Sequence, residues 1–267
     1  MAQQNDRSKL GPYVLMKTMA PLPLASRSLA IHEVHHTSHV IYRFPVCHDN
    51  AERRRFLSSV QTACTLNHSH ILKIEQYSFD SSNAAWVITP FTGDADGLLT
   101  LERLLRAKNG RMHPDEAERA IVQLLEAFDY AHQLRQYHGP LSMDEVLIDR
   151  HGSLLIELFG MSRLAQGLTG GNSELIRDEV RSVVEIGYQL ITGLRAEEPI
   201  IPAGRLLKRL DPRWDRWFDQ GLDPAQGFDS TEEAMAFLPS LSQIVEPKRP
   251  SGPVRSVLGR LWTAKRI

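Results

Sequence analysis

The chain has 267 residues, of which 42% are hydrophobic and 24% charged, so it can bury a full core, and we expect one domain of two lobes. Its formal net charge of −1 excludes a global attraction for nucleic acid or for an acidic surface. The two cysteines, Cys47 and Cys64, are too few for a disulfide framework and form no Cys-x-x-Cys site, so we expect a cytoplasmic protein. The polar N-terminus and the absence of a long apolar run predict neither secretion nor a membrane span.

The first third of the chain has the pattern of a small antiparallel sheet with one helix. Apolar and polar residues alternate in short runs over residues 13–44, which is typical of strands. Residues 51–66 repeat apolar side chains at i, i+4, i+7 and i+8, which predicts a helix. Residues 71–77 and 84–88 predict two more strands, and the polar, glycine-bearing residues 92–97 predict a connector.

Beyond the connector the pattern becomes helical. We expect helices over residues 99–105, over 113–131 with a proline in the first turn, and over 179–192, which Gly193 ends. Two later helices are expected over 206–222 and 231–238. A stripe of large apolar residues at helical spacing belongs in the core, and its members are Trp214, Trp217, Phe218 and Leu222.

The most informative segment lies between these helices. It reads His138-Gly139-Pro140-Leu141-Ser142-Met143-Asp144-Glu145 and, after two short apolar runs, Leu158-Phe159-Gly160. It resembles the catalytic loop and the metal-binding turn of protein kinases, His-Arg-Asp-Leu-x-x-x-Asn and Asp-Phe-Gly. The packing positions of that pattern are retained, and they are His138, Leu141, Phe159 and Gly160. The reactive positions differ: Gly139 stands at the Arg, Pro140 at the catalytic Asp, Glu145 at the Asn and Leu158 at the metal-binding Asp.

Four further segments match the same family in chain order. Residues 40–43 (Val-Ile-Tyr-Arg) stand where protein kinases have Val-Ala-Ile-Lys, and residues 66–72 resemble the Leu-x-His-Pro-Asn-Ile that follows the first-lobe helix. Residues 190–193 resemble the Leu-Leu-Thr-Gly of a buried helix, and residues 223–228 resemble the Asp-Pro-x-x-Arg-Phe of bacterial eukaryotic-type Ser/Thr kinases.

The resemblance covers about residues 12–240 and implies an α+β, two-lobed protein kinase fold. The N-lobe, a small antiparallel sheet with one helix, is expected over about 12–92, and the mainly helical C-lobe over about 93–245. A tail, 246–267, follows.

The nucleotide-binding positions implied by the resemblance are degenerate. Ala20, Leu22 and Ala25 stand at the three loop glycines, where only a residue without Cβ lets the backbone approach phosphates. Two prolines between them remove backbone donors. Ile41 stands at the small Ala that packs on adenine, so we expect it to project into the adenine site and leave an occluded or unused cleft.

The charged positions that would hold the phosphates have also changed. Arg43 stands at the phosphate-binding Lys, and its planar fork does not substitute for a compact ammonium. Ser59 stands at the helix Glu that would pair with that Lys, and it cannot make the ion pair.

These departures predict an inactive pseudokinase. Loss of a general base alone typically costs about 10²–10⁴-fold in rate, and here the metal ligand, the Lys and the glycine loop are missing as well. We therefore expect a regulatory or scaffold module that binds a protein partner, uses no cofactor and binds no nucleic acid. The alternative is a divergent kinase or nucleotide-binding protein whose metal is held by a displaced carboxylate such as Glu145 or Glu157. Mg²⁺- and nucleotide-dependent thermal stabilisation would separate the two.

A histidine-rich segment could be interpreted as a metal site. Its strand-turn-strand spacing is expected to place the imidazoles on different faces, and no cysteine accompanies them, which favours ordinary surface histidines. These residues are His32, His35, His36, His39 and His48.

The tail is strongly basic. Residues 247–267 carry six Lys or Arg and no acid, which leaves 25 basic against 32 acidic residues in the rest of the chain. Its apolar residues recur at helical spacing, which predicts an amphipathic helix that docks on a partner or on an anionic membrane surface. The alternative is that it folds back on the acidic C-lobe. The residues concerned are Val254, Val257, Leu258, Leu261 and Trp262, with Arg255 and Arg260.

Overall fold

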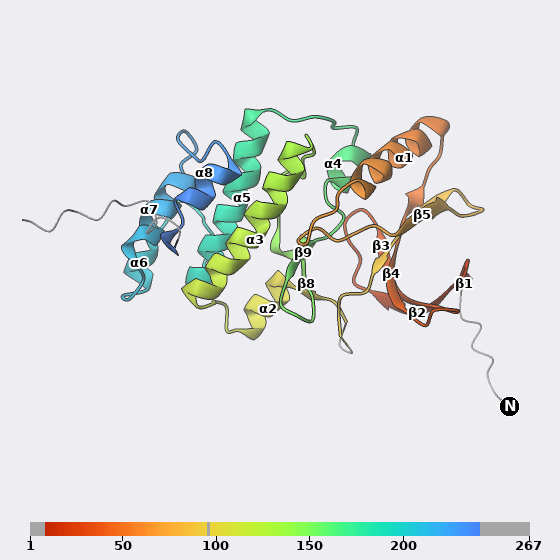
Figure 1. Cartoon of the computed structure of the whole chain (residues 1–267), viewed down its shortest axis with the longest axis horizontal. Coiled ribbons are helices and arrows are strands. Elements are labelled where there is room, and N and C mark those ends of the chain that lie inside the picture. The colour runs from red at the N-terminus through yellow and green to blue at the C-terminus, as the bar shows by residue number, and fades with distance from the viewer. Residues whose placement is uncertain (1–8, 95–96, 241–267) are drawn as a thin grey trace, which may run out of the picture.

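The computed structural model describes residues 9–94 and 97–240, so the helix expected within residues 247–267 lies outside the described part. Two lobes lie side by side, one built on a sheet and one on helices (Figure 1). The expected two-lobed α+β fold is confirmed. None of the described helices is long and apolar enough to cross a bilayer.

The N-lobe is a six-stranded antiparallel sheet with the order β1-β2-β3-β4-β6-β5. One helix, α1 (Asn50–Cys64), begins where the Asp49 carboxylate accepts hydrogen bonds from the N–H groups of Ala51 and Glu52. The strand expected from residue 71 begins only at residue 76, after a loop. The strands are β1 (Lys9–Leu10), β2 (Tyr13–Met19), β3 (Ser26–His32), β4 (Ser38–Val46), β5 (Gln76–Phe79) and β6 (Ala84–Pro90).

The two faces of β4 belong to different apolar clusters. Val40, Tyr42 and Phe44 face α1 and the C-lobe, where they pack with Phe56 of α1 and with Leu158. Ile41 faces the other way. The inner cluster therefore takes side chains from both lobes and joins them with apolar contacts.

The C-lobe is built around two long helices, α3 (Pro114–Gln133) and α5 (Ser173–Thr192), which pack along each other (Figure 1). Gly187 permits the close approach, because a Cβ there would lie 2.7 Å from the Ile121 side chain. The remaining elements are β7 (Leu99–Thr100), α2 (Leu101–Ala107), a 3₁₀ turn η1 (Met143–Glu145), β8 (Val146–Ile148), β9 (Leu154–Ile156), α4 (Met161–Ala165), α6 (Ala203–Leu206), α7 (Pro212–Gly221) and α8 (Thr231–Ala236).

The largest differences from the expected helices occur at two places. The helix expected from residue 179 begins six residues earlier at Ser173, where the Asn172 side chain accepts a hydrogen bond from the Leu175 N–H. The single helix expected over 206–222 is instead α6 and α7, because Asp211 and Pro212 start a new helix. The stripe on α7 does lie in the core: Trp214, Trp217, Phe218 and Leu222 are all buried.

Candidate functional site

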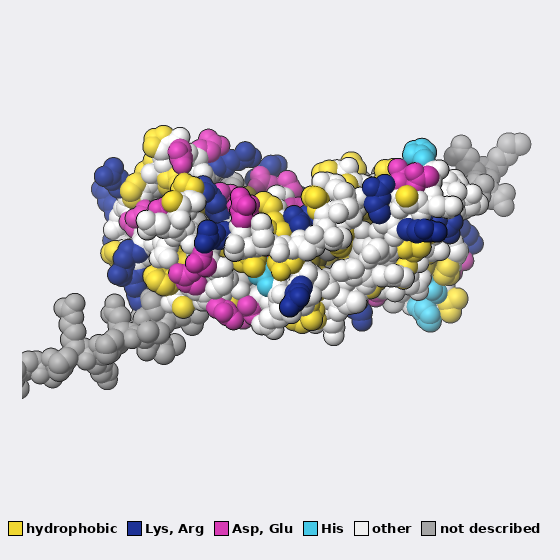
Figure 2. Space-filling view, turned by 90° about the horizontal axis from the view of Figure 1, so that it is seen from above, with side chains coloured by type: hydrophobic (Ala, Val, Ile, Leu, Met, Phe, Trp, Pro, Cys, Tyr) yellow, Lys and Arg dark blue, Asp and Glu magenta, His cyan; other side chains and the backbone are white. Residues whose placement is uncertain are grey.

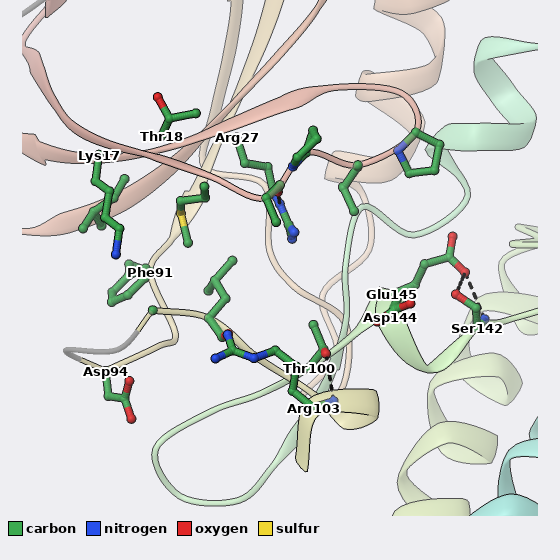
Figure 3. A pocket seen from close by; sticks show the side chains of 18 residues that line it. Lys17, Thr18, Arg27, Phe91, Asp94, Thr100, Arg103, Ser142, Asp144 and Glu145 are labelled. Carbon is green, nitrogen blue, oxygen red and sulfur yellow. Dashed lines mark hydrogen bonds between the residues drawn. The ribbon is translucent and has the colours of Figure 1, made fainter. Parts of the chain in front are cut away.

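A cavity of about 650 Å³ lies between the lobes (Figure 3). Its roof is β2 with the turn that follows, residues 17–23, and its rear wall is the connector near Phe91 and Leu98. Its floor includes Thr100, Arg103 and η1. A cavity of this size could hold a small molecule, so the cleft is not occluded, and the expectation that it is unused stays a prediction.

Charges of both signs line this cleft. Lys17 and Arg27 approach from the roof and Arg103 from the floor, as Figure 3 shows. They are matched by three acidic side chains, Asp94, Asp144 and Glu145. The lining therefore has no excess of positive charge with which to attract a polyphosphate.

The expectation that Ile41 projects into the adenine site is wrong. Ile41 packs on the outer face of the sheet, in a cluster with Tyr13, Ala30 and Ile88. A one-residue change of register turns every side chain of a strand to the opposite face. Tyr42 therefore occupies an inward position of β4, whereas Arg43, which the resemblance placed at the phosphate-binding Lys, does not.

Arg43, by contrast, lies away from the cleft. Its side chain is largely exposed and pairs with Asp80, at the end of the β5–β6 hairpin. It is not among the residues that line the cavity. Ser59, expected at the helix Glu, is buried, and its hydroxyl donates to the Arg55 carbonyl 2.8 Å away. The structure thus does not bring these two positions together in the cleft.

A buried ion pair crosses between the lobes behind the cavity. Nη1 of Arg27, on β3, lies 3.0 Å from both carboxylate oxygens of Glu157, which directly follows β9. The Tyr42 hydroxyl donates to the same carboxylate, and Arg27 Nε donates to the Ala20 carbonyl at 2.6 Å. The side chains of Arg27 and Glu157 are only 8% and 1% exposed.

The surroundings of this pair perturb its ionisation. Burial raises the pKa of Glu157, whereas the charge of Arg27 and the hydrogen bond from Tyr42 act in the opposite direction. Burial and the Glu157 charge raise the pKa of Tyr42 well above its ordinary value, so the hydroxyl stays protonated and donates. The carboxylate is thus already engaged by two donors. Sequence reasoning missed both Arg27 and Tyr42.

The remnant of the catalytic loop is held by its packing. The His138 ring lies 5.1 Å from that of Phe159 and both are buried, as is Leu141. Gly160 has φ of +70°, and a Cβ there would lie 2.9 Å from the Tyr137 carbonyl oxygen, so glycine is required. The four retained residues therefore occupy packing and backbone positions.

At the positions of the missing reactive groups the structure offers little chemistry. Pro140 is exposed and has no polar side-chain atom. Leu158 is buried in the inner apolar cluster and has φ of +47°, a conformation that is rare for a branched residue. Glu145 accepts hydrogen bonds from the Ser142 N–H and hydroxyl, both at 3.0 Å (Figure 3).

Side chains of α5 also hold the backbone of the catalytic-loop remnant. The buried Glu179 carboxylate accepts a hydrogen bond from the Gly139 N–H at 2.6 Å, and its other oxygen lies 2.5 Å from Nε2 of His132. The Ser182 hydroxyl accepts from the Leu141 N–H at 2.9 Å. The backbone course of the loop is thus set by buried polar contacts.

The expectation that the histidines lie on different faces is wrong for three of them. The ring of His32 lies 4.5 Å from that of His35 and 6.4 Å from that of His39. Burial, together with these two neighbours, lowers the pKa of His32. His39 is engaged by Glu75 and Thr37. Across residues 9–94 and 97–240, no three His, Cys, Asp or Glu side chains are grouped so as to hold a metal ion.

The amino-acid sequence of this chain is similar to those of protein kinases. The model of a family described as "Protein tyrosine and serine/threonine kinase" matches residues 29–175. The serine/threonine-protein kinase PrkC of Bacillus subtilis is 29% identical over 129 residues, 48% of this chain and 19% of that protein. The CBL-interacting protein kinase 33 of Oryza sativa is 30% identical over 107 residues, 40% of this chain and 22% of that protein.

The chain thus spans about a fifth of the length of these curated relatives. Among solved structures, the PknI kinase domain of Mycobacterium tuberculosis superposes with a TM-score of 0.66 at 17% identity, over 86% of this chain and 96% of that domain. At this identity the superposition is a likeness of fold.

Proposed function

The chain belongs to the protein tyrosine and serine/threonine kinase family, and from this premise we propose that it is a pseudokinase, a regulatory or scaffold module that binds a protein partner and transfers no phosphate. The observation that carries the proposal is the buried contact of Arg27 and Tyr42 with Glu157. The inward position of β4 is occupied by a tyrosine, and the carboxylate behind the cleft is neutralised by the protein's own guanidinium.

The chemistry of phosphoryl transfer supports the same conclusion. The reaction requires positioned metal ions and a group that orients or deprotonates the acceptor hydroxyl. Pro140 supplies no proton acceptor, and Leu158 supplies no metal ligand and is packed among apolar side chains. Glu157, one of the two displaced carboxylates that the alternative could use, would have to give up Arg27 before it could bind a metal. The other, Glu145, accepts hydrogen bonds from Ser142.

The basic segment 247–267 supports a partner, or a membrane, with a negatively charged surface. On the face of the described residues that Figure 2 shows, basic and acidic side chains are interspersed over the helical lobe. That face offers no broad acidic surface for the segment to fold back on. An external anionic surface is our proposal for it, and the charge of the segment is the observation that supports the proposal.

We expect no transfer of the γ-phosphate of ATP to the chain itself or to a generic protein acceptor. The measurement is incorporation of radiolabelled phosphate with Mg²⁺ or Mn²⁺, compared with a reaction without protein. Glu145→Gln and Glu157→Gln are the matched variants. Transfer by the unaltered chain that either variant abolishes would establish the divergent-kinase alternative in place of the pseudokinase.

We also expect ATP with Mg²⁺ to leave the melting temperature unchanged. A ligand present at 100 times its Kd stabilises the folded state by about 2.7 kcal/mol. For a chain of this length that corresponds to a shift of roughly 5–10 °C, which is easily measured. A saturable, Mg²⁺-dependent shift would show that the cleft is a working nucleotide site, while the absence of transfer would still stand as a separate result.

A further inference from the structure

A second cavity, of about 190 Å³, lies between α1, the end of α3, α4 and the loop after α4. We call it the arginine pocket. Its lining contains two arginines and no carboxylate, in contrast to the charge-balanced cleft. The residues on which the argument rests are Thr62, Arg135, Tyr137, Arg163, Leu168 and Thr169.

The side chain of Arg163 lies close against the glycine of the catalytic-loop remnant. A Cβ at Gly139 would lie 3.2 Å from Cδ of Arg163, which is closer than ordinary van der Waals contact. Gly139 also has φ of +92°, a conformation that L side chains rarely adopt. The glycine at the family's Arg position therefore makes room for a guanidinium that comes from α4.

The second arginine stands where glycine would be more stable. Arg135 follows the end of α3 with φ of +55°, and its N–H donates to the His132 carbonyl at 2.8 Å. Left-handed residues after a helix are usually Gly or Asn, because other side chains add a steric cost there of roughly 1 kcal/mol. An arginine at this position brings a charge to the pocket at some expense of stability.

Both guanidinium groups have donors to spare. Within the described part of the chain, neither Arg135 nor Arg163 forms an ion pair. Arg163 donates from Nη2 to the Gly170 carbonyl at 3.0 Å, which holds the group in place and leaves Nε and Nη1 for another acceptor. Thr62, Tyr137 and Thr169, each of which carries a hydroxyl, also belong to the lining. All of these groups can donate to an anion.

We propose that the arginine pocket binds an oxyanion carried by a segment of a partner protein, either a phosphorylated side chain or a carboxylate. Guanidinium groups recognise both through charge-assisted hydrogen bonds. The cavity is smaller than the roughly 300 Å³ at which small-molecule sites begin, so it fits one side chain rather than a whole cofactor. Leu168, which is 50% exposed beside it, offers an apolar contact to the residue that follows the anion. This inference rests on the proposed function in that it gives the partner its chemistry.

The test is a titration of the ¹⁵N-labelled full chain with three blocked amino acids: phosphoserine, glutamate and serine. The signal is the Nε–Hε resonance of Arg163, with ionic strength matched by chloride. We expect phosphoserine, glutamate or both to shift it in a saturable way, and serine to leave it unchanged. Which of the two anions binds more tightly identifies the source of the oxyanion. No saturable shift with either anion overturns the proposal.

Two variants separate binding from folding. Arg135→Gly removes a guanidinium, so the affinity of the pocket for the anion should fall about tenfold or more. The same change places glycine at a left-handed position, so the melting temperature should stay the same or rise. Arg119 is an exposed arginine on α3 that lies outside this pocket, so Arg119→Gln is the matched loss of one charge and should change neither the affinity nor the melting temperature. Equal weakening by both variants would mean non-specific attraction and would overturn the pocket. Failure of the pocket leaves the pseudokinase proposal standing, whereas phosphate transfer by the chain would defeat that proposal whatever the pocket binds.

Discussion

Replacement of Glu157 by alanine should lower the free energy of unfolding by about 3–5 kcal/mol. The substitution leaves the guanidinium of Arg27 buried without a counter-ion, which is the costly way to break a buried pair. It also removes the acceptor of the Tyr42 hydroxyl. Urea denaturation near neutral pH gives the value directly.

The double variant Arg27→Met/Glu157→Leu distinguishes a lost charge from lost packing. Replacing a buried ion pair by apolar residues of similar size often leaves the free energy of unfolding unchanged. The double variant should therefore recover most of the stability that Glu157→Ala loses. The exposed Arg43–Asp80 pair is the control, and Arg43→Met should cost less than about 1 kcal/mol. If Glu157→Ala costs no more than that control, the pair does not hold the lobes together.

Replacement of Glu179 by alanine should be comparably severe. The change leaves the Gly139 N–H without its acceptor and His132 without its carboxylate, at about 1–3 kcal/mol for each unsatisfied buried group. The amides of residues 138–141 should exchange with solvent faster, because the loop loses its anchor on α5.

Glu174→Ala, in the exposed first turn of the same helix, is the matched control for Glu179. It removes one carboxylate from α5 without touching the loop, so it should cost less than about 1 kcal/mol. If Glu179→Ala loses no more stability than Glu174→Ala, and the loop amides exchange at an unchanged rate, Glu179 does not anchor the loop.

The sequence predicted the kinase fold because packing and backbone positions, such as His138 with Phe159, keep their residue types when the chemistry is lost. It failed on the register of β4. Residues 40–42 are all apolar or aromatic, so the run has no phase that reveals which side chains face inward. Only the pairing of β4 with β3 and β6 fixes that phase. The one usable signal was the charge of Arg43 between Tyr42 and Phe44, which indicates the exposed face.

The ion pair behind the cleft was beyond prediction for a different reason. Arg27 lies in a strand whose alternation is compatible with an exposed arginine, and its partner Glu157 is 130 residues away. No local pattern links the two, because the contact depends on how the lobes come together. The break between α6 and α7, in contrast, was visible in Asp211 and Pro212, which together have the form of a helix start.

The side chain of Arg163 lies against Gly139, so a substitution at either position should affect the other. A side chain at 139 would meet Cδ of Arg163 at 3.2 Å, so the side chain of Arg163 would have to shift. Restoring the family's Arg at 139 would therefore disturb Arg163, one of the two arginines of the proposed anion site. A variant that rebuilds this part of the catalytic loop should be tested for effects on the arginine pocket as well, because residues in contact do not change independently.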